Sequence, residues 1–327
     1  MTLFILTLFQ TGYKLRISTL YHLLVGKRTS SVLLHGFFYD NLAYLGSFPQ
    51  LKEEDFQKEL QQLMNQQLIT VDDGYGRLTE AGKQHLAKGS MDLSGLNNLR
   101  YGRMRDNVWQ LILFAVQVTS HWSFGEKEYL PIENRPYYLQ QLKKWLSTSD
   151  AGLVERVRQE LMETLQQLPT ENANFLANQF SGHQFQGKAA FQLLADQTEP
   201  WRLLYTQRSI DLFLAKLDQG ELSRLVAALD QQNINQSMLK TREFFLAGKS
   251  LPEILDLRHL KQGTINDHFI EWALLDPTFP FEEFELLDFA ALEKEQVIDA
   301  YYQDYDLAYL NFRLSQIHFL RSNHGTD

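Results

Sequence analysis

The stretch TREFFLAGKSLPEILDLRHLKQGTINDHFIEWALL, Thr241–Leu275, predicts two short helices, a tight turn and a third helix. Ile265, Phe269 and Trp272 recur at helical spacing, so we expect them to form the inner face of the third helix. We expect apolar side chains of the second helix and the turn to cover that face, namely Leu251, Ile254, Leu255, Leu257 and Leu260. This order is typical of a helix-turn-helix, in which the third helix fits the major groove of DNA.

The residues that this arrangement turns outward are candidates for contact with nucleic acid. Gln262 and Asn266 carry amides suited to adenine edges, and Lys261 lies beside them at the start of the third helix. The nearby cations Lys249 and Arg258 are suited to phosphates. The stretch holds four Lys or Arg against five Asp or Glu, and one of these acids faces the same way. DNA contact and a pure packing or protein-docking role are therefore both open.

The negative charge of the chain is concentrated at its C-terminal end. Of the net charge of −9, residues 276–327 contribute −8, with three Lys or Arg against eleven Asp or Glu. The first 275 residues hold 28 basic and 29 acidic side chains, so they have room for local basic surfaces. The Gln/Asn-rich connector DQQNINQS precedes the opening stretch. We therefore predict a domain over 236–327, a helix-turn-helix with acidic closing helices that face protein or compete with DNA.

No pattern in the sequence indicates an enzyme, a cofactor or a metal site. AGKS, at Ala247–Ser250, resembles the end of a phosphate loop, but the first glycine of that motif is absent, so we predict a turn between helices. There is no Cys, no H-E-x-x-H pair and no G-x-S-x-G elbow. His183 has no partner at ligand spacing. We therefore expect no catalytic residue and no metal ligand.

Residues 1–92 have the order of a winged helix, with three helices, a hairpin turning at Asp73-Gly74 and a last helix after Thr79. The third helix begins LKEEDFQKE, and its acids make a role in the major groove unfavourable. Lys27 and Arg28 precede a predicted helix start, where exposed amides favour anions. We expect this turn either to hold a phosphate or to be an ordinary solvated turn.

Residues 93–235 form a predicted central helical region, so the whole chain is predicted to be mainly α. Within this region, 152–217 has either the order of a sigma-region-like helix-turn-helix or that of a plain helical bundle. The apolar runs MTLFILTLFQ and VWQLILFAVQV are shorter than the roughly 20 residues that a membrane helix needs. We therefore expect a cytoplasmic protein without a membrane partner.

The block KTREFFLAGKSLPEILDLRHLKQGTINDHF resembles the helix-turn-helix domain at the C-terminus of some RecQ-type DNA helicases and of a stand-alone bacterial family encoded beside one. The matching features are Thr241, Gly248-x-Ser250, Ile254, Arg258, Leu260, Thr264-Ile265 and His268. YHLLVGKRTSSVLLH and LTEAG also resemble the stand-alone family. The resemblance implies an accessory role to a RecQ-type helicase in DNA repair or replication-fork maintenance.

Together these features lead to one main hypothesis and two alternatives. The main hypothesis is a non-catalytic, nucleoid-associated DNA-binding factor whose partners are DNA, a RecQ-type helicase and a single-strand-binding protein. The first alternative is an adaptor that docks those proteins without touching DNA. The second is a transcriptional regulator, which would need a defined operator and a symmetric dimer, and no dimerisation heptads occur in the sequence.

Overall fold

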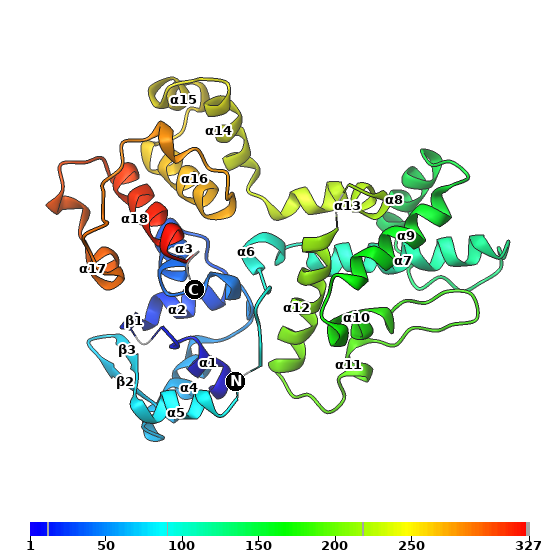
Figure 1. The fold of residues 1–327 in the computed structure, drawn as a ribbon, viewed down its shortest axis with the longest axis horizontal. Coiled ribbons are helices and arrows are strands. Elements are labelled where there is room, and N and C mark those ends of the chain that lie inside the picture. Colours follow the sequence, from blue (N-terminus) through cyan, green and yellow to red (C-terminus); the bar gives the residue numbers. More distant parts are fainter. Residues whose placement is uncertain (12, 90, 218, 325–327) are drawn as a thin grey trace. The chain divides into compact units, whose positions relative to one another are not determined.

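The structure, a computed structural model, describes residues 1–11, 13–89, 91–217 and 219–324 and is mainly helical, as the sequence predicts. The chain forms two compact units (Figure 1). We call Ser90–Asn233 the central unit, and Thr2–Gly89 together with Ile234–Asp327 the terminal unit. The N-terminal and C-terminal segments of the chain therefore share one folded body.

The N-terminal segment of the terminal unit has the helices and the hairpin predicted for a winged helix. Its elements are α1 (Thr2–Thr7), β1 (Leu15–Arg16), α2 (Ile17–Leu24), α3 (Ser30–Phe38), α4 (Glu53–Asn65), β2 (Ile69–Asp72), β3 (Tyr75–Leu78) and α5 (Glu80–Ala87). The strands are antiparallel in the order β1-β3-β2. Asp73 and Gly74 adopt φ of 47° and 75° in the turn, which explains the Asp-Gly pair. The hydroxyl of Thr79 caps α5 by accepting from the amide of Gly82, at 3.0 Å.

The opening apolar stretch of the chain lies in the core of the terminal unit. The side chains of Phe4, Ile5, Leu6, Leu8 and Phe9 have no exposed surface. The hairpin approaches them closely, because a Cβ added to Gly76 would lie 2.5 Å from the ring of Phe9. The sequence prediction did not include α1 or β1, since neither shows a long periodic pattern. Burial of this stretch explains its composition without a membrane.

The C-terminal segment of the terminal unit contains the predicted helix-turn-helix and its closing helices. These are α14 (Gln236–Leu246), α15 (Leu251–Arg258), α16 (Gln262–Leu275), α17 (Lys294–Asp299) and α18 (Tyr309–His324). Ile265, Phe269 and Trp272 are buried on the inner face of α16, as predicted. Leu257 differs from the prediction, because its side chain is 51% exposed. α15 ends at Arg258, where His259 turns the chain with φ of 50° and leaves Leu257 on the outside.

The last helix of the chain packs against α16, which also contacts α14 and α3 (Figure 1). The buried apolar side chains of α18 are Leu310, Phe312, Leu314, Ile317 and Leu320. The acidic C-terminal segment is therefore folded over the described residues up to His324 rather than being a free tail.

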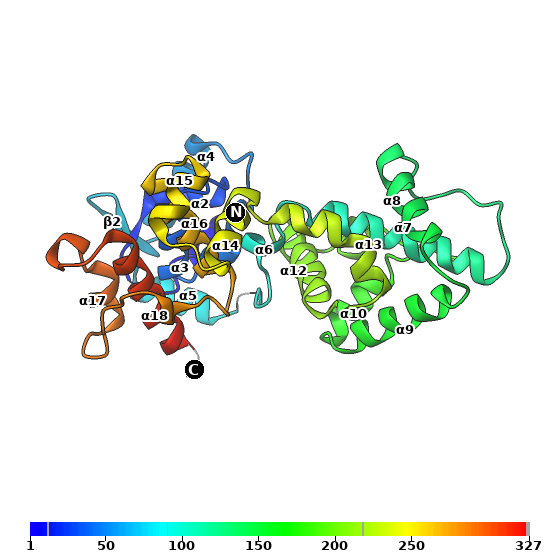
Figure 2. The same cartoon turned by 90° about the horizontal axis from the view of Figure 1, so that it is seen from above.

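The central unit is a bundle of helices around α7, and α13 runs beside α7 (Figure 2). Its helices are α6 (Asn98–Tyr101), α7 (Arg105–Ser123), α8 (Pro136–Ser147), α9 (Leu153–Gln166), α10 (Thr170–Ala177), α11 (Ala190–Leu193), α12 (Trp201–Lys216) and α13 (Glu221–Asp230). A buried ion pair joins α7 to α12, with Arg105 Nη2 2.5 Å from Asp211 Oδ2. No helix in the described ranges is both long enough and apolar enough to cross a membrane.

The proposed sigma-region-like motif falls on α9, α10 and α12 of the central unit. Residues 178–200 separate α10 from α12 and contain only the short helix α11. α12 buries Leu204, Ile210 and Phe213 in the core of the central unit. A second helix-turn-helix over 152–217 stays a prediction.

Candidate nucleic-acid interface

One hydroxyl holds the three helices of the helix-turn-helix together. Thr241 Oγ1 lies on α14 and accepts a hydrogen bond from Arg258 Nη1 of α15, at 2.7 Å. The same oxygen lies 2.8 Å from Nδ1 of His268, on α16. Arg258 also donates to the carbonyl and the hydroxyl of Ser237, at 2.8 and 2.9 Å. These contacts fix the three helices relative to one another. The pKa of His268 is lowered, mainly because the ring is buried and also because the positive charge of Arg258 lies nearby.

The AGKS sequence forms the turn between α14 and α15, as predicted. Gly248 adopts φ of 79°, which places the chain in the left-handed region after α14. The carboxylate of Glu253 accepts from both the amide and the hydroxyl of Ser250, each at 2.8 Å. Lys249 Nζ lies 3.4 Å from the same carboxylate. The anion that this turn holds is therefore the protein's own Glu253, at the first turn of α15.

Only the beginning of α16 is open to solvent. Lys261 and Gln262 are exposed, and Gln262 Nε2 donates to Asn266 Oδ1 at 2.9 Å. From His268 to Leu274 every residue of α16 is buried, on all sides of the helix. α14, α18 and α3 surround that part. The helix can therefore approach DNA with its N-terminal turn but not along its length.

Two predicted contact residues have internal partners instead. Arg258 is occupied by Ser237 and Thr241, as described above. Arg28 forms an ion pair with Glu271 of α16, with Nη2 2.6 Å from Oε1 and side chains 13% and 7% exposed. A guanidinium held by a buried carboxylate is not available to a phosphate. We therefore revise both arginines from DNA contacts to residues that position the helices.

The remaining predicted contacts are exposed or partly exposed. Lys27, Lys249, Lys261 and Gln262 are exposed, and Asn266 is half-buried. Within the described residues, neither Lys27 nor Lys261 has an ion-pair partner. Thr29 caps α3 by accepting from the amide of Val32, at 3.4 Å, so the turn at Lys27 keeps the geometry of a helix start. Lys27 is thus the one predicted cation of that turn whose head group is free in the described structure.

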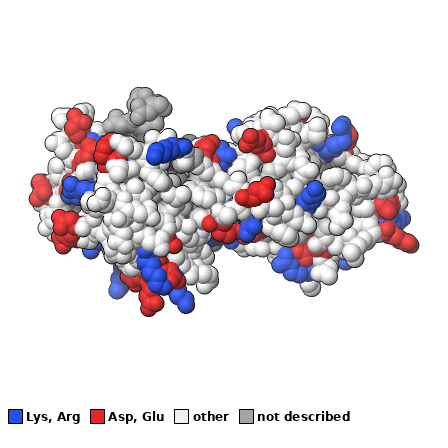
Figure 3. Space-filling view, turned by 90° about the horizontal axis from the view of Figure 1, so that it is seen from below, with Lys and Arg blue, Asp and Glu red and all other residues white. Residues whose placement is uncertain are grey.

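Charged side chains elsewhere on the surface are mixed in sign. Figure 3 shows Lys and Arg interspersed with Asp and Glu, with wide uncharged areas, on the face that it displays. Arg242 pairs with Asp276 at 3.2 Å, and Lys58 pairs with Asp55 at 2.8 Å at the acidic start of α4. The acidic first turn of α4 supports the expectation that this helix does not enter a groove of DNA.

A cavity of about 420 Å³ in the terminal unit brings together cations and aromatic rings, which the sequence did not predict. Its lining includes Lys14, Arg16, Arg313, Tyr75, Tyr301 and Tyr309. Lys14 Nζ pairs with Asp299 at 3.1 Å, whereas Arg16 is exposed and has no ion pair in the described part of the chain. Tyr75 and Tyr301 are 37% and 53% exposed. Exposed rings beside a free cation are the elements that bind single-stranded nucleic acid.

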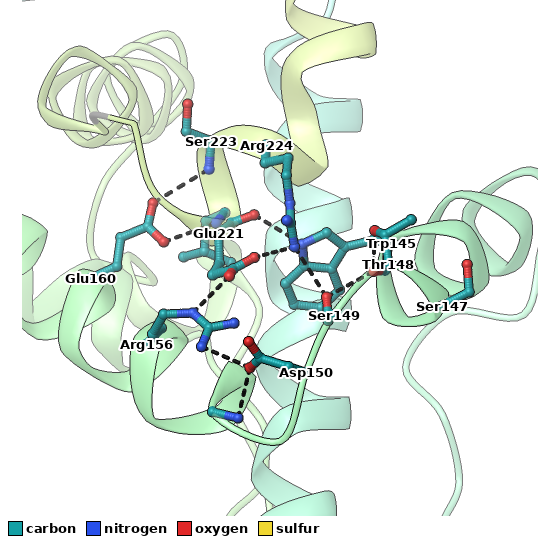
Figure 4. A network of polar contacts seen from close by, with 12 residues as sticks. Trp145, Ser147, Thr148, Ser149, Asp150, Arg156, Glu160, Glu221, Ser223 and Arg224 are labelled. Atoms are coloured by element: carbon teal, nitrogen blue, oxygen red, sulfur yellow. Dashed lines mark hydrogen bonds and ion pairs between the residues drawn. The ribbon is translucent and has the colours of Figure 1, made fainter.

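A cavity of about 400 Å³ in the central unit has a different character (Figure 4). Arg156 and Arg224 both line it, and both donate to the carboxylate of Glu221. The carboxylate of Glu160 accepts from the amide of Leu222 at 2.9 Å, at the start of α13, and burial raises the pKa of Glu160. Among the described residues the charges of Arg156, Arg224 and Glu221 satisfy one another, and Glu160 caps α13, so the network has a structural role.

Comparison with known proteins supports the helix-turn-helix. Residues 237–318 match a family described as a helix-turn-helix domain. The chain is also similar to Protein YpbB of Bacillus subtilis (strain 168), with 23% identity over 281 residues, 82% of this chain and 80% of that protein. No solved structure matches the chain. The matched segment contains the Thr241, Arg258 and His268 network and runs into the first part of α18.

His183 has no partner at ligand spacing in the sequence, but the fold gives it a partner distant in sequence. His183 Nδ1 lies 2.8 Å from Oε2 of Glu126, and His121 Nδ1 lies 2.5 Å from the same oxygen. A ligand pair within one helix is visible in a sequence as a fixed spacing, whereas this group does not have such a spacing. A helix end brings His121 and Glu126 together, and His183 comes from a loop 57 positions after Glu126.

Proposed function

We propose that this protein is a non-catalytic DNA-binding factor that acts beside a RecQ-type helicase on the bacterial nucleoid, in the cytoplasm. The observation that carries the proposal is the exposed N-terminal turn of α16, in a segment that matches a helix-turn-helix family. A helix-turn-helix is primarily a DNA-binding motif.

The proposed contact is to phosphates more than to bases. The side chain of the N-cap residue Lys261 does not cap the start of α16, where the first amides of a helix lack partners within it. Lys249, in the turn before α15, and Lys27, before α3, add further cations. Gln262 and Asn266 can reach a base edge only from the tip of the helix, because the rest of α16 is covered. Such contacts position a protein on DNA and give little sequence preference.

The helicase role rests on the resemblance of the helix-turn-helix block to RecQ-type C-terminal domains. Thr241, Arg258 and His268 are among the matching positions, and here they form one network that joins three helices. Because the matching positions hold the helices together in this chain, the resemblance supports a common domain architecture, and with it a common type of partner. A fork or a single strand would be the common substrate, and the cavity lined by Arg16 and Tyr75 is suited to the single-stranded part.

An adaptor that docks protein without touching DNA is the second candidate. Leu246 and Leu257 are 61% and 51% exposed on the outer side of α14 and α15. Two large exposed leucines on adjoining helices favour a protein contact at that place. The adaptor hypothesis predicts that substitution of these leucines, and not of the lysines, abolishes helicase capture.

Titration with DNA separates the two functions. Forked, single-stranded and duplex DNA are titrated at two salt concentrations against the wild-type protein, Lys261→Ala and the matched control Lys143→Ala, an exposed lysine of α8. Loss of one phosphate contact should reduce the steepness of the plot of log affinity against log salt by about 0.9 for Lys261→Ala, and should not do so for Lys143→Ala. Absence of binding even at low salt eliminates the DNA-binding function and leaves the adaptor. Equal slopes for both variants would place the DNA surface away from α16.

A further inference from the structure

Three side chains of the central unit converge on one point outside the proposed DNA surface. The imidazoles of His121 and His183 each place Nδ1 within 2.8 Å of Oε2 of Glu126. One ligand atom from each residue lies within 4.8 Å of the other two. Among the described residues this is the one group of three with such geometry.

The end of α7 brings Glu126 back to His121. Gly125 adopts φ of 68°, and its amide donates to the carbonyl of Trp122 at 3.0 Å. The amide of Glu126 donates to the carbonyl of His121 at 3.1 Å. This pair of bonds is the Schellman motif, which reverses the chain at a helix end. In the sequence HWSFGE, the glycine four residues after the histidine allows this chain reversal, which places Glu126 beside His121.

A tight turn places His183 beside α7. Gly182 and Phe185 exchange backbone hydrogen bonds of 2.9 and 3.2 Å, and the amide of His183 donates to Ser120 Oγ at 3.1 Å. A Cβ at position 182 would lie 2.3 Å from the same Ser120 oxygen. Only glycine lets this loop approach α7 so closely. The imidazole of His183 is thus positioned by its own backbone and not by chance proximity.

Aromatic rings hold both imidazoles in place. Tyr129 stacks on His121, with ring centroids 3.8 Å apart and planes 1° apart. Phe124 stacks on His183 at 4.2 Å, with planes 21° apart. The side chain of His121 is 9% exposed, whereas those of His183 and Glu126 are 23% and 35% exposed. The group is buried at His121 and open to solvent at Glu126 and His183.

We propose that His121, Glu126 and His183 bind a divalent transition metal, with Zn²⁺ as the expected ion. Two imidazole nitrogens and one carboxylate oxygen form a donor set that zinc sites use, with a fourth position left for water. Imidazole favours zinc over Mg²⁺ or Ca²⁺, which prefer all-oxygen sites. The open side of Glu126 and His183 provides the path by which the ion and its water enter.

Binding of the ion would require a small local expansion. Metal bonds of about 2.0–2.2 Å in tetrahedral geometry separate neighbouring ligand atoms by roughly 3.4 Å. The present Nδ1 to Oε2 distances are 2.5 and 2.8 Å, so the loops would move apart by less than about 1 Å. The ion would replace the two direct contacts between Nδ1 and Oε2. The site then crosslinks α7 to the loop that follows α10.

The test uses the full-length protein and Co²⁺ or Zn²⁺ as the probe. The metal-depleted protein is titrated with Co²⁺, and the visible absorption of the bound ion and the metal content per chain are measured. We expect saturation at about one ion per chain, with the intensity of low-coordinate cobalt. His183→Gln and Glu126→Gln should each weaken affinity more than roughly 100-fold, because even outer-shell changes cost metal sites 10–100-fold. Zn²⁺ should displace the cobalt.

The matched control is His85→Gln, which changes an exposed histidine of α5 in the terminal unit. It should bind metal as the wild type does. Circular dichroism of each metal-free variant establishes that it is folded, and Glu126→Gln keeps the shape of the side chain. Two results would overturn the proposal: wild-type protein that takes up no stoichiometric metal, or uptake that His183→Gln and Glu126→Gln leave unchanged. In either case the three residues form only a hydrogen-bonded clamp between two loops.

Discussion

Arg28 and Glu271, 243 positions apart in the sequence, form a nearly buried ion pair of 2.6 Å. Arg28 precedes α3 of the winged helix, and Glu271 lies in the C-terminal half of α16. The second oxygen of Glu271 accepts from Nδ2 of Asn235, which caps the start of α14, at 2.9 Å. One carboxylate therefore links the winged helix, the connector and the helix-turn-helix. The position of α16, and with it the exposed turn at Lys261, depends on the N-terminal segment.

Replacing Arg28 by Met should destabilise the terminal unit by about 3 kcal/mol, because it leaves Glu271 buried without its cation. Urea denaturation, followed by circular dichroism, measures the change. The neighbouring exposed lysine provides the control, and Lys27→Met should stay within about 0.5 kcal/mol of the wild type. The double variant Arg28→Met with Glu271→Met should recover much of the loss, since it removes the unpaired charge. A double variant less stable than Arg28→Met would contradict this account.

Arg258→Ala should reduce stability and leave the salt dependence of DNA binding unchanged. Its guanidinium makes three hydrogen bonds to α14 and none to a free surface. Loss of hydrogen bonds to a charged group costs about 1.5–3 kcal/mol. Thermal melting and the salt slope are measured on the same preparation, beside Lys261→Ala, for which the opposite pattern is expected. If the folded Arg258→Ala protein showed a less steep dependence of log affinity on log salt than the wild type, Arg258 would be a phosphate contact after all.

The pattern of apolar residues was sufficient to predict the helix-turn-helix. Ile265, Phe269 and Trp272 are buried as their spacing indicates, and the Asp73-Gly74 turn forms the hairpin. Both predictions depend on local periodicity and turn chemistry, which a sequence displays directly. The exposure of Leu257 was missed because it depends on where α15 ends, and helix ends are set by caps such as His259.

The sequence could not indicate which distant residues meet. The segments 1–92 and 236–327, predicted as separate domains, contact one another through Arg28 and Glu271. Neither segment contains a sequence pattern that indicates this contact. The same limit affected the candidate site. Arg28 and Arg258 are cations at suitable places along the chain, but their partners lie on other elements: Glu271 pairs with Arg28, and hydroxyl and carbonyl oxygens of α14 accept from Arg258. Composition identifies a cation, whereas only the fold shows whether it is free.

Acid should destabilise the terminal unit through His35. Burial, followed by the nearby Arg16 charge, lowers the pKa of His35 from 6.5 to about 4. Its Nε2 accepts from the amide of Arg16 at 3.2 Å, which requires the neutral ring. Because the folded pKa is the lower one, the unfolded chain takes up the proton first, and stability is lost as pH falls from about 6.5 towards 4, by up to about 3 kcal/mol. The lowered pKa of His268 acts in the same direction.

The free energy of unfolding at pH 7, 6 and 5 measures this effect. His35→Gln keeps a side-chain acceptor for the Arg16 amide and removes the titrating group, so its stability should depend less on pH than that of the wild type. His85→Gln, an exposed substitution, should retain the wild-type dependence. Identical pH profiles for the wild type and His35→Gln would show that His35 does not titrate differently in the two states.

Deletion of residues 282–327 should unfold the terminal unit and not merely release a tail. It removes α18, whose Phe312, Leu314 and Ile317 are fully buried, and uncovers α16. Burial of side chains of this size contributes about 1.5–3 kcal/mol each, so loss of these three alone removes about 4.5–9 kcal/mol, which is comparable with the whole stability of a typical domain, about 5–15 kcal/mol. Hydrogen exchange resolved by peptide is the measurement: amides of α16 should lose protection, while those of α7 in the central unit keep it. A truncated protein that retains protection in α16 and binds DNA more tightly would instead make the acidic segment a competitor of DNA.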